Sequence, residues 1–203
     1  TGSAVGYTLG YYDSNRDFVP LYSIPDENKI TVLKNVDLWV SGSTYSELPL
    51  SSYTGVVGTN CVQLDALFDQ GEGETLRESL SRAGYDAYLC AVSGGYRVRV
   101  GKWTEESDAQ AAQAGVESVC GYPTVLRGSS RTCYTVVVTG TDEILFQLDY
   151  LGSARLGIEP ESELTWFKGY QYRGGFEYYR ASGGNLSVIN VVGLTDYIKG
   201  VLP

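Results

Sequence analysis

The chain has 203 residues, of which 43% are hydrophobic and 19% are charged, and its formal net charge is −9. This composition is typical of a globular protein. The acidic balance disfavours nucleic acid as a partner, because phosphate binding depends on Lys and Arg. The chain has no histidine, which excludes a Ser-His-Asp triad, a Cys-His dyad and a His-liganded metal site built from this chain alone.

The first 58 residues are predicted to form strands followed by a connecting segment. Apolar Val5, Tyr7 and Leu9 alternate with small or polar residues, as one face of a strand requires. Residues 41–59 are rich in Ser, Thr, Gly and Pro, which is typical of a connection between structured parts. The sequence has neither a signal-peptide pattern nor a methionine. We therefore expect a processed or trimmed piece of a longer protein.

The middle of the chain alternates strand and helix patterns. Strands are predicted at 62–66, 85–92, 96–102 and 123–126, and helices at 71–84 and 104–119. The order strand, helix, strand, strand, helix, strand predicts a split βαβ (βαββαβ, ferredoxin-like) arrangement with both helices on one face of a four-stranded antiparallel sheet. The other face is left to solvent or to a ligand, and the residues expected there include Gln63, Asp65, Arg97 and Arg99.

After Cys133 the chain returns to strand patterns. Short β-prone runs occur at 134–138, 145–148, 162–166, 176–179 and 186–190, and residues 194–201 could form a short helix. Strands thus flank the middle module on both sides. We predict an α+β protein in which a mostly-β domain, residues 1–58 and 129–203, carries an inserted domain at residues 59–128.

The four cysteines are widely spaced and include no Cys-x-x-Cys pair, which disfavours a zinc site. An even number with this spacing suits one or two disulfides in an oxidising compartment, whereas four buried thiols are the plainer alternative. The pairs we consider first are Cys90–Cys120 and Cys61–Cys133. We predict neither a metal site nor a cofactor.

The middle module resembles SPOR domains, which bind peptidoglycan strands stripped of their stem peptides. The resemblance rests on 62–65 in the first strand, on 83–85 at the first helix exit, and on 96–101 before an Ala-rich helix. It implies a glycan-binding sheet face with Gln63, Asp65, Arg97 and Arg99, supplemented by rings such as Tyr88 and Tyr96. A merely solvated sheet face is the alternative.

Three ordered blocks near the end of the sequence, 172–177, 186–190 and 194–203, resemble the core signature of the SpoIID/LytB domain. The resemblance implies the class of peptidoglycan lytic transglycosylases that act in sporulation, or their accessory relatives. Thr195 stands where the family usually has a Glu.

Glycosidic cleavage needs a carboxylic acid that protonates the leaving oxygen. The resemblance places this Glu after the segment 200–203, and Pro203 is the last residue of the sequence. We therefore expect this stretch to be inactive by itself. We expect most of its other candidate acids to be solvated surface charges, namely Glu143, Glu159, Glu161, Glu163 and Glu177.

The leading functional hypothesis is an extracytoplasmic, wall-directed part of a lytic transglycosylase, with peptidoglycan glycan strands as its partner and other wall or sporulation proteins as further partners. The alternative is an accessory protein that positions wall hydrolases without cleaving glycan. An RNA-recognition-like module shares the strand and helix order, but the acidic charge and the missing aromatic strand motif argue against it.

Overall fold

A computed structural model describes residues 6–27, 29–150, 155–181 and 184–201, and it divides the chain into two compact units. Unit 1 comprises residues 1–30 and 153–203, and unit 2 comprises residues 31–152. The described residues are mostly β with three short helices, α1 (Gln70–Arg82), α2 (Glu106–Cys120) and α3 (Leu194–Val201). The protein therefore belongs to the α+β class, as predicted. No described helix has the length and hydrophobicity that a membrane span requires.

Unit 1 contains a five-stranded sheet, whose strands come from the beginning and from the end of the described chain. Its order is β17 (Leu186–Val191), β16 (Gly175–Arg180), β13 (Leu156–Pro160), β1 (Gly6–Tyr12) and β2 (Phe18–Pro25), with every neighbouring pair antiparallel. The register of β1 on β13 sets Leu9 opposite Ile158, and both are buried in the core. A separate hairpin consists of β14 (Leu164–Phe167) and β15 (Tyr170–Arg173).

Unit 2 contains a seven-stranded sheet and a small three-stranded sheet. The large sheet has the order β10 (Thr124–Arg127), β7 (Asn60–Leu64), β9 (Gly95–Trp103), β8 (Ala87–Val92), β12 (Ile144–Asp149), β11 (Cys133–Val138) and β3 (Ile30–Lys34). The small one has the order β5 (Thr44–Ser46), β4 (Leu38–Ser41) and β6 (Gly55–Val57). Two of its strands thus lie in the stretch that we expected to be only a connection.

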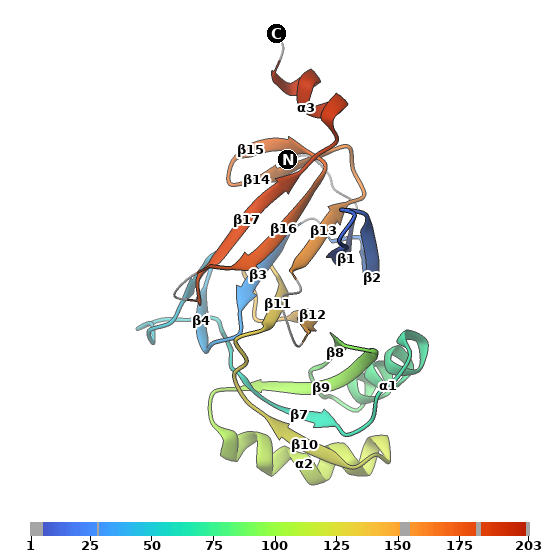
Figure 1. The fold of residues 1–203 in the computed structure, drawn as a ribbon. Coiled ribbons are helices and arrows are strands. Elements are labelled where there is room, and N and C mark those ends of the chain that lie inside the picture. Colours follow the sequence, from blue (N-terminus) through green and yellow to red (C-terminus); the bar gives the residue numbers. More distant parts are fainter. Residues whose placement is uncertain (1–5, 28, 151–154, 182–183, 202–203) are drawn as a thin grey trace. The chain divides into compact units, whose positions relative to one another are not determined.

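The predicted order of strands and helices between residues 60 and 127 is present: β7, α1, β8, β9, α2, β10. Helix α1 begins after Asp69, whose side chain accepts a hydrogen bond from the Glu72 amide at 2.9 Å and so caps the helix. Helix α2 ends at Cys120 and is followed by Gly121, whose φ of 73° suits glycine. Both helices lie against β7–β10 (Figure 1), where Leu80 and Val116 join the fully buried core.

The sheet does not end with the four strands of this module. Strand β12 pairs in parallel with the outer edge of β8, with Phe146 opposite Leu89, and β11 and β3 follow. The boundaries between the two compact units lie between residues 30 and 31 and between residues 152 and 153. The limits that we predicted for the inserted domain lie at residues 59 and 128. Alternating apolar residues identify strands but not which edges pair, so the sequence patterns did not reveal this continuation.

Candidate functional site

The predicted glycan-binding residues fall on two faces of the large sheet. Side chains alternate along a strand, so Arg97 and Arg99 on β9 point away from the helices while Val98 points toward them. Register sets Gln63 and Tyr88 opposite Arg99 from the two neighbouring strands, and Asp65 lies 3.8 Å from Arg97 as an ion pair. We call this side of the sheet the arginine face.

Tyr96 is separated from the other five predicted residues. It precedes Arg97 in β9, so alternation turns it to the opposite face, and its backbone N–H and C=O pair with those of Phe68. The sequence prediction grouped Tyr96 with the arginines because it considered aromatic type and proximity in the chain. The structure brings together Gln63, Asp65, Tyr88, Arg97 and Arg99 only.

We expected the arginine face to be open, but its centre is closed. Gln63, Tyr88 and Arg99 are only 2%, 3% and 5% exposed. The reason is the continuation of the sheet, because β12 and β11 bring Gln147 and Cys133 against the Arg99 guanidinium. Arg97 and Asp65 at the edge of the face keep more exposure, with 27% and 56% of their side-chain surfaces accessible.

Arg99 is the centre of a polar network under the face. Its Nε donates to Gln63 Oε1 at 3.0 Å, Nη1 donates to Gln147 Oε1 at 2.7 Å, and Nη2 donates to Asp149 Oδ2 at 2.8 Å. A charged group taken out of water is tolerated only when it is paired in this way. Arg99 therefore holds three strands together and is not free to bind a ligand with its whole guanidinium.

Asp149 is the acidic member of this network. Burial by itself raises its pKa, but the hydrogen bond and charge of Arg99, together with the Thr132 and Ser130 hydroxyls, outweigh burial and lower the pKa from its ordinary value. The carboxylate is therefore charged at neutral pH. Sequence reasoning missed this residue. The available signal was the alternation of Gln147 and Asp149 with apolar Leu148, which marks a polar face on an otherwise apolar strand.

A pocket of about 460 Å³ opens above the network, and all its lining residues belong to unit 2. Three arginines, Arg97, Arg99 and Arg127, line it with one acid, Asp149. Its other walls are apolar, from Leu67 and Val92, or carry hydroxyls, from Ser93, Ser129, Ser130 and Thr132. In a chain with a net charge of −9, this pocket is locally cationic. Its arginines can bind an anionic group of a ligand. Its hydroxyls can hydrogen-bond to sugar hydroxyls, and its apolar side chains can contact methyl groups.

Three of the four cysteines are buried and the fourth is partly buried, and none of the four forms a disulfide. Cys90 shares the arginine face with Tyr88, whereas Cys120 ends helix α2 on the other side of the sheet, so the sheet separates this predicted pair. Cys61 and Cys133 lie on β7 and β11, with three strands between them in the sheet order. Burial raises the pKa of the Cys61 and Cys133 thiols and raises that of Cys90 to about 12.

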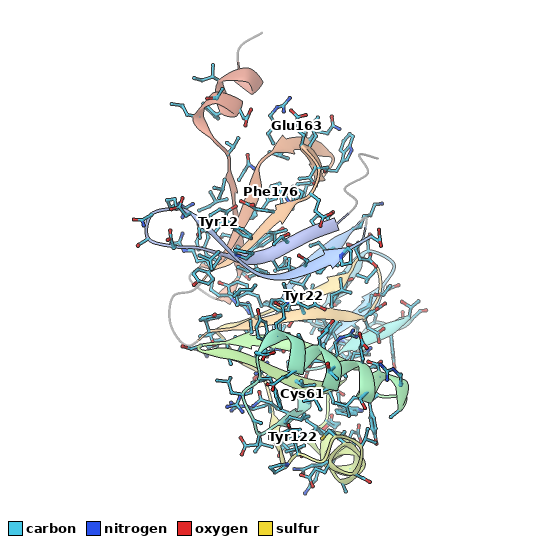
Figure 2. All side chains as sticks on the ribbon, turned by 90° about the vertical axis from the view of Figure 1, so that its right-hand side faces the viewer. Tyr12, Tyr22, Cys61, Tyr122, Glu163 and Phe176 are labelled. Atoms are coloured by element: carbon cyan, nitrogen blue, oxygen red, sulfur yellow. The ribbon has the colours of Figure 1, made fainter. Side chains whose placement is uncertain are left out.

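Unit 1 has a pocket of about 690 Å³ lined by residues of both charges, among them Glu159, Glu161, Glu163, Arg16 and Arg173. Figure 2 labels Glu163 beside the β14–β15 hairpin, where it forms an ion pair with Arg173. Glu161 and Glu163 are exposed, as expected, but Glu177 is 2% exposed. It lies 3.2 Å from Arg16 and 3.2 Å from Arg155, so it is a buried ion-pair partner and not a solvated charge.

Among the described residues, no cluster of three or more Cys, Asp or Glu side chains is suited to hold a metal ion. Comparisons of the chain with models of protein families, with curated proteins and with solved structures give no significant match.

Proposed function

We propose that the protein binds the glycan strands of peptidoglycan through the pocket beside β9, and that it acts outside the cytoplasm as a wall-directed part of a SpoIID/LytB-like lytic transglycosylase. In this proposal residues 59–128 are SPOR-like, and the blocks that resemble the SpoIID/LytB signature, 172–177, 186–190 and 194–203, belong to unit 1. The observation that carries the binding proposal is the pocket itself, with Arg97, Arg99 and Arg127 gathered on one face of an acidic chain.

The pocket chemistry fits a glycan from which stem peptides have been removed. Hydrolysis of the amide bond between a stem peptide and the lactyl ether of muramic acid leaves a carboxylate on the sugar. Arg97 and exposed Arg127 offer charged donors to such a group. Leu67 and Val92 offer apolar contacts to lactyl or acetamido methyl groups.

In this proposal the described residues bind glycan, and none of them is assigned as a catalytic acid. Glu177, the acid in the motif shared with the SpoIID/LytB signature, is paired with two arginines and does not line the pocket of unit 1. Protonation of a leaving group, which the resemblance implies for the family, is therefore not assigned to any of the described residues.

The test is sedimentation of the 203-residue chain with purified peptidoglycan, either intact or treated with an amidase. Arg97→Ala/Arg127→Ala is the informative variant, because both side chains lie at the accessible edge of the pocket and Arg99 stays in place. Arg82→Ala is the matched control, since Arg82 is an exposed arginine on α1. We expect the parent chain and Arg82→Ala to bind amidase-treated peptidoglycan more strongly than intact peptidoglycan. We expect the double variant to lose this stronger binding. Equal binding by the double variant, or no binding by the parent chain, would refute the proposal.

A further inference from the structure

One wall of the pocket is a loop rather than a strand. Residues 128–132 connect β10 to β11, and Gly128, Ser129, Ser130 and Thr132 line the cavity. A loop whose conformation is fixed before binding favours affinity, because ordering a loop upon binding costs free energy. Side-chain hydrogen bonds fix the conformation of residues 128–132.

Two side chains from distant parts of unit 2 clamp the loop. Asn35, after β3, accepts a hydrogen bond through Oδ1 from the Ser130 amide at 2.7 Å. Asp149, at the end of β12, accepts through Oδ1 from Ser130 Oγ at 3.0 Å and from Thr132 Oγ1 at 2.8 Å. Its second oxygen accepts from Arg99. Asp149 thus connects the buried network to the loop.

Ser130 Oγ and Thr132 Oγ1 also lie 3.0 Å from each other, where either can donate, and Ser130 Oγ accepts from the Thr132 amide at 3.3 Å. A hydroxyl oxygen has two lone pairs, so Thr132 Oγ1 keeps at least one of them for a further donor. It can therefore accept from a sugar hydroxyl, while the arginines complement a carboxylate.

We propose that Asn35 and Asp149 are positioning residues that hold residues 128–132 in the binding conformation, so that glycan affinity depends on two side chains outside residues 59–128. This inference rests on the proposed function. Asn35 does not line the pocket, is 9% exposed, and contacts the loop through an acceptor atom. It can therefore be changed without removing a ligand contact.

The experiment uses the 203-residue chain with Asn35→Ala, Asn35→Asp, and the exposed-site control Asn185→Ala in unit 1. Binding to amidase-treated peptidoglycan is measured over a range of salt concentrations, and amide hydrogen exchange is measured without ligand. We expect Asn35→Ala to bind about three- to tenfold more weakly, the effect of one lost hydrogen bond. The loss should be the same factor at every salt concentration, because no charge is removed.

Hydrogen exchange separates positioning from general destabilisation. Asn35→Ala should speed exchange at Ser130 and Thr132 while amides of β7 and β9 stay protected. Asn35→Asp keeps the acceptor and should restore slow exchange. Unchanged exchange in Asn35→Ala, or faster exchange with undiminished binding, would overturn the inference. If the parent chain fails to bind, the proposed function is wrong, and so is the predicted dependence of affinity on this loop. The exchange data still show in that case whether Asn35 holds the loop.

Discussion

Arg99 Nη1 on β9 lies 2.7 Å from Gln147 Oε1 on β12, so a hydrogen bond reaches across the strand that separates them in the sheet. Together with Gln63 and Asp149, this bond gives the guanidinium a partner on each side. The sequence predicted the same residue, together with Arg97, as a ligand contact. Its actual partners show that it is a structural centre at the base of the pocket, so the mutations that test the proposed binding differ from those that test stability.

Replacing Arg99 with Ala should destabilise unit 2 by about 3–5 kcal/mol, because removing one partner of a buried ion pair leaves the other charge uncompensated. Urea unfolding followed by circular dichroism measures this change. Arg82→Ala, which removes an exposed arginine, should stay within about 0.5 kcal/mol of the parent. An Arg99→Ala midpoint equal to that of Arg82→Ala would show that the network contributes little to stability.

Acid should weaken unit 2 partly through Asp149. Burial raises the pKa of this carboxyl, but Arg99 and the two hydroxyls outweigh burial and lower the folded-state pKa. A lowered folded-state pKa adds stability that is present above the unfolded value of about 3.9 and is lost as the pH falls through the folded-state pKa. The free energy of unfolding of Asp149→Asn should therefore lie below the parent's at pH 7, and the gap should narrow below about pH 4. A gap that stays constant down to pH 3 would contradict this linkage.

The sequence predicted the strand and helix order of residues 60–127 and most of the strands after Cys133, because those elements carry clear local periodicity. It missed β13 and β15. It did not predict that β12 would pair with β8, since strand pairing between segments so far apart in the chain leaves no local pattern. For the same reason it placed Gln63, Tyr88 and Arg99 on an open face, and it missed Asp149 and Asn35 altogether. The alternation of polar residues correctly placed Arg97 and Arg99 on one face of β9. The burial of the Arg99 side chain depends on β12 and β11, which local patterns do not reveal.

The thiols offer a direct test of the two cysteine alternatives. Burial raises the pKa of Cys61, Cys90 and Cys133, so these side chains form little thiolate at pH 8 and are shielded from reagent. Cys120 is only partly buried. We expect about one thiol to react with Ellman's reagent in the native protein and four in urea without reductant. Fewer than four in urea would reveal disulfides and contradict the alternative of four buried thiols.

We expect the folding unit to extend beyond residues 59–128. In a fragment of residues 59–128, Arg99 has neither Gln147 nor Asp149, and β8 has an unpaired edge where β12 binds in the whole chain. A buried charge without partners and an open strand edge both disfavour a stable monomer. Residues 31–152 contain all these partners. We expect the longer fragment to unfold in one cooperative thermal transition and the shorter one to lack such a transition or to aggregate. Equal melting temperatures for the two fragments would show that residues 59–128 fold independently, and that β12 and β11 only cover a module that is already complete.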